Sequence, residues 1–474
     1  MTSTRPTYWT RTRRRVVQAA AVPLVAALVL TGCGAAASTS TTAASSTTST
    51  AADMAGAPAA PPGGGAGGSA QYTAKGAYTV SSGTQTKSGT ITSDAQDTSG
   101  VLVTGGTLSL TDAKVTTSGT TSSGDESSFY GLNAGVLVNG GSATVDGGSV
   151  TSTGDGANSV FAYGDGTVTV TGTTLTASGK WAHGIMASGG GTITATDVTS
   201  TTTGSNGATV ATDRGGGTIT VTGGTFTTSG QDSPAIYSTG TITIKGGTYV
   251  AKGAEAVVIE GSNSVTVTGS SITAEKAGKW GVMLFQSMSG DAQGVDAKYT
   301  QTGGSLTETA SDSPLFLVTN TTGTITLTGV KVSNASDVLL EAVAKGWGTA
   351  GSNGGNAVLV ASGGTLTGDV VVDAVSTASV SLKSGSTLKG AVDRAGTGKS
   401  VAVTLDTSST WTLTADSNVT SLVGATVSGS SVTNIVGGGH TLTYDASDDA
   451  NGYLGGKTYT LAGGGGTLTP STAS

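Results

Sequence analysis

Two short segments of the chain combine a lysine with a tryptophan in the same local motif. They are Gly179-Lys180-Trp181 and Gly278-Lys279-Trp280. The face of Trp181 or Trp280, with Lys180 or Lys279 beside it, is suited to stacking on a sugar ring, and Trp347 adds a third indole. Scarce aromatic residues also commonly cover an apolar corner of a fold. The motif therefore predicts either a sugar-contacting surface or two structural corners.

The composition limits what other chemistry the chain can perform. Only 11% of its 474 residues are charged, 4% are aromatic, and it has two histidines and one cysteine. The sequence therefore indicates no metal site and no intramolecular disulfide. Glycine contributes 78 residues, so a compact globule of this length would lack material for a thick core. Low charge and ordered Thr, Val and Ile argue against long disorder and favour a thin, repetitive β architecture.

The elements that must position any site are repeated strands. Segments 167–172, 218–223 and 324–329 each alternate polar and apolar residues and end in glycine. This period of two is typical of a strand with one buried face. Each of these alternating strands is followed by another apolar residue three positions after its closing glycine. A further short apolar segment precedes each alternating strand, as at Ile185 and Ile236.

Most copies are about 22–26 residues apart, which fits one coil of a parallel β-helix with three strands and three turns. Stacked coils share one narrow core, in which Phe226 and Tyr249 are predicted to stack. Asp112 and Asp197 replace glycine at a corner and are predicted to be structural, because Asp tolerates positive φ. We expect regular coils over 72–355, and irregular coils with a cap over 356–474.

Two families resemble this pattern. Residues 409–422 resemble the end of pertactin-like autotransporter passengers, which are right-handed β-helical adhesins. Over some 390 residues the chain resembles pectate-lyase-like β-helix proteins. The resemblance implies an all-β, right-handed parallel β-helix, and it implies an adhesin or glycan-binding role.

In pectate-lyase-like proteins, sugar usually binds along the first strand face of each coil. The resemblance places these residues on the equivalent surface here: Tyr163, Asp165, His183, Asp213, Arg214, Tyr237 and Glu260. Catalysis there needs paired carboxylates, often calcium, and a proton shuttle. The same acids are also compatible with soluble turns. Whether the chain is an enzyme stays open, and no cofactor is predicted, because nothing in the sequence supports calcium.

Outward threonines form a third candidate surface. The alternation places these residues on one face: Thr169, Thr171, Thr194, Thr196, Thr220, Thr222, Thr243, Thr266, Thr268, Thr326 and Thr328. The arrangement resembles the Thr-x-Thr arrays of β-helical antifreeze proteins, which implies ice binding. Asp146, Lys245 and Lys298 interrupt the array, and Thr is also a common exposed strand residue.

The N-terminal region predicts where the chain resides. Residues 1–33 have a basic head and an apolar run that ends at Leu30-Thr31-Gly32-Cys33, which resembles the lipobox of bacterial lipoproteins. This resemblance implies lipidation of Cys33 and attachment to the outer side of the cell membrane. Residues 12–17 also resemble a twin-arginine export signal. Residues 34–71 are rich in Ala, Ser, Thr, Pro and Gly, and are predicted to be a disordered tether.

Charge further restricts the partners. Five of the 22 basic residues and none of the 29 acidic residues lie before residue 34, so the remainder has a net charge of −12. Nucleic acid is therefore excluded as an expected partner. We expect a lipid-anchored surface protein that binds a polysaccharide or cell-wall glycan without catalysis. A polysaccharide lyase or hydrolase and an ice-binding protein are the alternatives.

Overall fold

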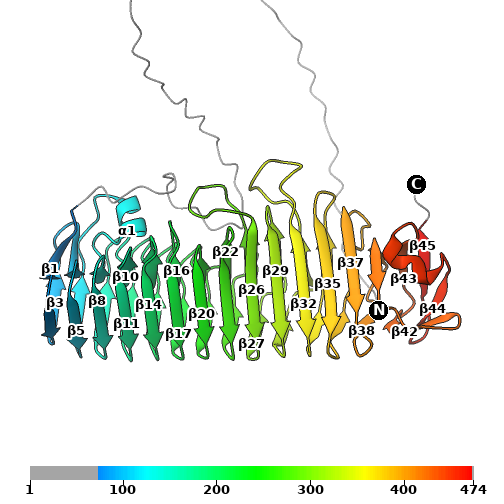
Figure 1. The fold of residues 1–474 in the computed structure, drawn as a ribbon, viewed down its shortest axis with the longest axis horizontal. Helices are drawn as coiled ribbons and strands as arrows, with labels where there is room; N and C mark the ends of the chain where they lie inside the picture. The colour runs from blue at the N-terminus through cyan, green and yellow to red at the C-terminus, as the bar shows by residue number, and fades with distance from the viewer. Residues whose placement is uncertain (1–72, 472–474) are drawn as a thin grey trace, which may run out of the picture. The chain divides into compact units, whose positions relative to one another are not determined.

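The computed structural model describes residues 73–471, which form a stack of β-coils (Figure 1). Equivalent strands of neighbouring coils pair in parallel and form long sheets that run along the stack. The predicted parallel β-helix is therefore confirmed. Within the described residues, no helix is long and apolar enough to cross a membrane. Cys33, the predicted signal and the predicted tether up to residue 71 lie outside the described residues.

Three parallel sheets, A, B and C, form the sides of the coils. Sheet A consists of β1 (Lys75–Val80), β4 (Thr98–Val103), β7 (Val136–Val138), β10 (Val160–Tyr163), β13 (Ile185–Ser188), β16 (Val210–Thr212), β19 (Ile236–Ser238), β22 (Val257–Glu260), β25 (Val282–Phe285), β28 (Phe316–Thr319), β31 (Val338–Ala342) and β34 (Asp369–Val372). Sheet B consists of β2 (Thr84–Lys87), β5 (Thr107–Thr111), β8 (Ser142–Asp146), β11 (Thr167–Thr171), β14 (Thr192–Thr196), β17 (Thr218–Thr222), β20 (Thr241–Lys245), β23 (Ser264–Thr268), β26 (Asp296–Thr302), β29 (Thr322–Thr328), β32 (Asn356–Ser362), β35 (Thr377–Lys383), β37 (Ser400–Leu405) and β40 (Ser421–Val423). Sheet C consists of β3 (Thr90–Ser93), β6 (Lys114–Thr117), β9 (Ser149–Ser152), β12 (Thr174–Ala177), β15 (Thr199–Thr202), β18 (Thr225–Thr228), β21 (Thr248–Ala251), β24 (Ser271–Ala274), β27 (Ser305–Glu308) and β30 (Lys331–Asn334).

The last coils use a fourth, mixed sheet, D, in place of sheet C. It consists of β33 (Thr365–Thr367), β36 (Thr387–Lys389), β38 (Thr410–Thr412), β42 (Ser431–Val436), β44 (Tyr459–Ala462), β45 (Thr467–Ser471), β43 (Thr441–Asp445) and β39 (Ser417–Val419), with β41 (Val427–Ser428) paired to β42. The short 3-10 helix η1 (Asp449–Leu454) packs beside β40. Antiparallel pairing of β41 with β42 and of β44 with β45 departs from the regular coils.

The core runs along the interior of the stack. On sheet B, apolar residues such as Val168, Ile193 and Ile219 occupy one register position and are fully buried. On sheet C, the rings of Phe226 and Tyr249 stack with centroids 4.7 Å apart and planes within 4°, which confirms the predicted pair. Each coil buries its apolar side chains only against its neighbours, as expected of a solenoid.

Asp112 and Asp197 adopt φ of 47° and 51° at the corner after a sheet B strand. This is the left-handed region, which Asp reaches more easily than most residues. Their predicted structural role at the corner is therefore confirmed.

Two additions cover the outer face of sheet A, and the repeat did not predict the first of them. The helix α1 (Gly124–Tyr130) begins where the Ser123 side chain caps the backbone N–H of Glu126, and it ends at Gly131, with φ of 78°. Gly131 lies directly against Leu137 and Phe161 of the sheet, where a Cβ would clash. The second addition is the loop 286–294, which lengthens one coil between β25 and β26.

Candidate functional site

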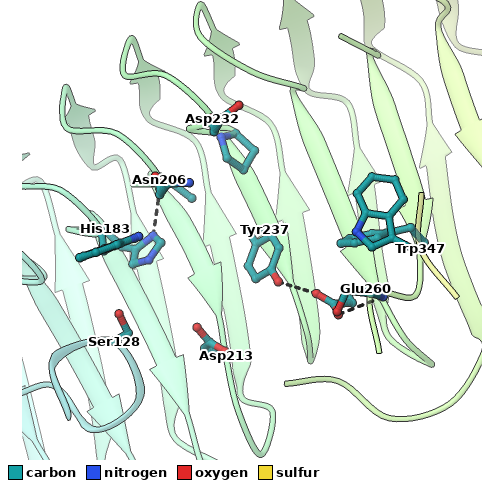
Figure 2. Close-up of a pocket in the computed structure, with 13 residues that line it drawn as sticks. Ser128, His183, Asn206, Asp213, Asp232, Tyr237, Glu260 and Trp347 are labelled. Atoms are coloured by element: carbon teal, nitrogen blue, oxygen red, sulfur yellow. Dashed lines mark hydrogen bonds between the residues drawn. The ribbon is translucent and has the colours of Figure 1, made fainter. Parts of the chain in front are cut away.

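A groove lies on the outer face of sheet A between these two additions (Figure 2). Its lining residues come from α1, from the turns that lead into sheet A, from the sheet itself and from later loops. They are Ser128, Trp181, His183, Asn206, Ala208, Asp213, Asp232, Pro234, Tyr237, Glu260, Phe285, Ser287 and Trp347. A mostly apolar depression with a few polar groups is typical of a small-molecule site.

One edge of the groove is a column of left-handed turn residues, one per coil. Gly156, Trp181, Asn206 and Asp232 have φ between 53° and 67°. Each of these turns is hydrogen-bonded to the next coil. The backbone N–H of Trp181 donates to the carbonyl of Ser205, that of Asn206 to Gln231, and that of Asp232 to Gly253. Gly, Asn and Asp are common at positive φ, whereas a bulky residue there is unusual and costs about 1–2 kcal/mol. The backbone of Trp181 is therefore strained at this position.

Three polar side chains of the groove keep atoms without a hydrogen-bond partner among residues 73–471. His183 Nδ1 accepts the backbone N–H of Ala208 at 2.9 Å, so Nε2 carries the proton and has no acceptor. Burial lowers the pKa of His183 to about 4, so the ring is neutral at pH 7. The buried Nδ2 of Asn206 also lacks an acceptor. Asp213 is 2% exposed and accepts only the backbone N–H of Arg214, through Oδ1, at 2.7 Å.

Of these atoms only Asn206 Nδ2 is fully buried, and a buried polar group without a partner costs about 1–3 kcal/mol. A ligand that supplied the missing partners would recover that free energy. The unpartnered atoms of His183, Asn206 and Asp213 thus define the polar part of a binding site whose floor is apolar.

A hydrogen-bonded carboxylate forms the opposite edge of the groove. Glu260, at the end of β22, accepts the Tyr237 hydroxyl at 2.7 Å through Oε2, and it accepts the Ser287 hydroxyl and backbone N–H through Oε1. Burial raises the pKa of Glu260 and raises that of Tyr237 well above its usual range, to which the nearby Glu260 charge adds. Burial also raises the pKa of Asp213 well above its usual range, with the Asp291 charge as the next cause.

Arg214 does not enter the groove as a free cation. Its Nε and Nη2 donate to Asp291 Oδ1 at 3.2 and 2.6 Å, and its guanidinium lies over the Phe129 ring, 3.6 Å from the centroid. The side chain thus joins the turn after β16, the loop 286–294 and α1. This contact fixes the two walls of the groove relative to sheet A.

The two Lys-Trp motifs have different surroundings. Trp181 is half-buried in the groove, and Lys180 Nζ lies 3.9 Å from the centroid of its ring. Trp280 is 7% exposed, does not line the groove, and donates its indole N–H to Glu341 at 3.0 Å. Lys279 is buried and pairs with Asp232 at 2.8 Å. The first motif contributes the Trp181 ring to the groove, and the Trp280 ring of the second packs against neighbouring side chains of sheet A.

Trp347 completes the aromatic part of the groove. Its ring lies 4.9 Å from that of Phe285, centroid to centroid, at an angle of 58°. Trp347 and Phe285 therefore form one side of the groove (Figure 2). Trp181 lies on the edge formed by the left-handed turns.

The remaining residues proposed from the sequence lie elsewhere. Asp165 is exposed in the turn between β10 and β11 and does not line the groove. Tyr163 packs edge-on against Tyr130 of α1 at 5.2 Å, outside the groove. The other candidate residues lie in the groove or directly behind it: Asp213, Arg214, Tyr237, Glu260 and His183.

The predicted threonine array lies on the outer face of sheet B. Its first row is Thr169, Thr194, Thr220, Thr243, Thr266 and Thr326, and the register extends it through Thr144 and Thr300. Its second row is Thr171, Thr196, Thr222, Thr268 and Thr328, with Lys245 and Asp146 in the same row. The Lys298–Asp296 ion pair, 2.7 Å long, lies on this face as well. Charges thus interrupt the face at several rungs.

Several residues in or directly behind the groove were not predicted from the sequence. Asn206 and Asp232 occupy the repeat position of Trp181, so an alignment of the coils at that turn would have found them. Ser287 and Asp291 belong to the inserted loop, whose unusual length in the repeat was the available signal. Ser128 lies on α1, which has no counterpart in the other coils and left no repeat signal.

Residues 118–293 are similar to a family described as periplasmic copper-binding protein (NosD). The matched segment is a little over a third of the chain and includes most of the groove. No curated protein matches the chain. A periplasmic family agrees with the location outside the cytoplasm that the N-terminal region predicts.

The described residues do not fit a copper site. Copper binds to clusters of imidazole, thiolate or thioether groups, and within residues 73–471 no three His, Cys, Asp or Glu side chains are grouped so that they could hold a metal ion. His183 and His440 are the two histidines of the chain; His183 faces the groove, and His440 lies 3.8 Å from Asp416 in the C-terminal coils.

Proposed function

We propose that this chain is a glycan-binding β-helix displayed outside the cytoplasm, attached to the membrane through Cys33, and that the groove on sheet A is its binding site. Sugars are amphipathic, with apolar ring faces and a rim of hydroxyls. The groove offers indole and phenyl faces at Trp181, Trp347 and Phe285, and its polar atoms lie beside an apolar floor.

One observation carries the proposal. His183 Nε2, Asn206 Nδ2 and an oxygen of Asp213 converge on one groove without partners among residues 73–471. Asn206 Nδ2 is buried, and buried polar atoms of native proteins almost always have a partner; the other two atoms belong to residues that line the same groove. Hydroxyl groups of a bound sugar would provide donors and acceptors for all three.

The test is a glycan array followed by titration calorimetry with the full chain. Trp181→Asn removes the indole and keeps a residue that tolerates the left-handed backbone, so we expect at least a tenfold loss of affinity with the fold intact. Thr220→Ala on the outer face of sheet B is the matched control and should bind as the natural chain does. Absence of binding across a broad array would refute the proposal.

Asp213 and Glu260 also lie in the groove, so the same samples are checked for products. Release of shortened or unsaturated sugars from a polysaccharide, lost in Asp213→Asn, would replace the binding role with an enzymatic one. We expect no product release.

A further inference from the structure

Acidic groups outnumber basic groups in and directly behind the groove. The acids are Asp213, Asp232, Glu255, Glu260 and Asp291, and the bases are Arg214, Lys279 and Lys180, whose Nζ lies 3.9 Å from the centroid of the Trp181 ring. His183 adds no charge at pH 7, because burial lowers its pKa to about 4. The groove lining contains carboxyl groups and no Lys or Arg side chain, and a cation bound beside Asp213 or Glu260 would favour the ionised form of that carboxyl.

Two of the three bases, Arg214 and Lys279, are already engaged by acids of the chain itself. Arg214 donates twice to Asp291 and is stacked on Phe129. Lys279 Nζ lies 2.8 Å from Asp232 and 4.0 Å from Glu255. None of the three bases lines the groove, and Lys180 is exposed beside Trp181 at its edge.

Asp213 supplies a second, independent observation. This carboxyl is almost fully buried and faces the groove, and one of its oxygens has no hydrogen-bond partner among the described residues. A cationic donor placed at this oxygen would favour the ionised carboxylate and form a charge-assisted hydrogen bond with it. Glu260 on the neighbouring edge holds a second carboxylate fixed by Tyr237 and Ser287.

We propose that the groove selects a saccharide that carries a free ammonium group, that is, an amino sugar without its N-acetyl group, with the ammonium placed at Asp213. This inference rests on the proposed function and names the ligand class for the same site. The apolar floor formed by Ala208, Pro234 and Tyr237, together with the indole of Trp181, fits a sugar ring better than a flexible polyamine or a lysine side chain.

Binding of this ligand is coupled to a proton. Asp213 faces Arg214 on its own turn, Tyr237 on β19, Glu260 on β22 and Asp291 on the inserted loop, and its pKa is raised by burial and by Asp291. An ammonium beside it favours the ionised form, so the carboxyl releases its proton to solvent as the ligand binds. Affinity should therefore rise with pH until the sugar amine itself loses its proton.

The experiment compares four probes by titration calorimetry on the full chain: a glucosamine hexamer, the matching N-acetylglucosamine hexamer, an oligogalacturonate and an oligolysine. We expect the glucosamine hexamer to bind at least tenfold more tightly than each of the other three. Titration in two buffers with different ionisation enthalpies should show proton release on binding. Asp213→Asn should abolish both the preference and the proton release, and Glu260→Gln should reduce the preference if Asp213→Asn does not fold.

The outcomes separate this inference from the proposed function. Equal affinity for both hexamers, unchanged in Asp213→Asn and lost in Trp181→Asn, would keep glycan binding and overturn the ammonium requirement. Oligolysine binding as tightly as the glucosamine hexamer would overturn it in favour of a cationic peptide. Failure of every glycan to bind would overturn the proposed function itself.

Discussion

The guanidinium carbon of Arg214 lies 3.6 Å from the centroid of the Phe129 ring, and the two residues come from elements 85 positions apart in the sequence. Arg214 also pairs with Asp291, on the loop inserted between β25 and β26. One side chain therefore holds α1 and the inserted loop in place on sheet A. The groove exists because these additions stand on either side of it.

Replacing Arg214 tests this contact. Arg214→Ala leaves Asp291 as a buried carboxyl without its cation, and breaking a buried pair from one side typically costs about 3–5 kcal/mol. We expect the loss to be local, seen as faster amide hydrogen exchange in 286–294 and in α1, with sheets B and C unchanged. Arg394, which is exposed, provides the matched control. Equal protection of the loop in Arg214→Ala and Arg394→Ala would show that the contact is not needed.

Replacing Trp181 should affect glycan binding without a large effect on stability. Its φ of 57° is costly for a bulky residue, and Asn206 shows that Asn fits the same turn one coil later. In Trp181→Asn, relief of the backbone strain offsets the lost indole packing, so the free energy of unfolding should stay within about 1 kcal/mol of the natural value. Urea unfolding monitored by circular dichroism measures it. A loss of several kcal/mol would mean that the indole serves the fold.

The coils could be predicted from the sequence because their determinants are local and repeated. The alternation at 167–172 and 218–223 places each strand, and the glycine or aspartate after it places each corner. The stacking of Phe226 on Tyr249 followed from the same register. Residues at the same position of neighbouring repeats are expected to be in contact, so a repeat predicts these contacts directly.

The groove depends on contacts that no repeat encodes. Asp291 and Arg214 are 77 residues apart, and only folding shows that they meet. Trp181 and Trp280 share a local motif, yet one lines the groove and the other is covered, because Glu341 and Lys345 lie over the second and not the first. Local sequence could not separate these two environments.

Glu255 makes stability depend on pH. Its carboxyl is fully buried without a hydrogen-bond partner among residues 73–471, and burial raises its pKa from 4.5 to about 7. Between these values the unfolded chain releases the proton and the folded chain retains it, so the free energy of unfolding falls as pH rises from about 4.5 to about 7. The contribution is about 3 kcal/mol and is fully present below pH 4.5.

Thermal unfolding at pH 4.5 and pH 7.5 checks this dependence. Glu255→Gln should remove the part of the stability difference between pH 4.5 and pH 7.5 that comes from this carboxyl. Glu275→Gln, at an exposed position, should leave that difference unchanged. Glu308 is a second buried carboxyl whose pKa burial raises to about 7, so part of the dependence should persist in Glu255→Gln. Identical pH profiles for the natural chain and Glu255→Gln would contradict the assignment.

Two core tyrosines should respond in opposite directions to loss of the hydroxyl. The Tyr249 hydroxyl is buried and has no partner among the described residues, whereas the Tyr299 hydroxyl donates to Gln301 at 2.7 Å. Tyr249→Phe removes an unsatisfied polar group and keeps the stack on Phe226, so it should stabilise the fold by about 1–2 kcal/mol. Tyr299→Phe leaves the buried Gln301 oxygen without its donor and should destabilise by a similar amount. Urea titrations of both variants measure the pair. If Tyr249→Phe were the less stable of the two, the prediction would be wrong and the Tyr249 hydroxyl would contribute favourably to the stability of the fold.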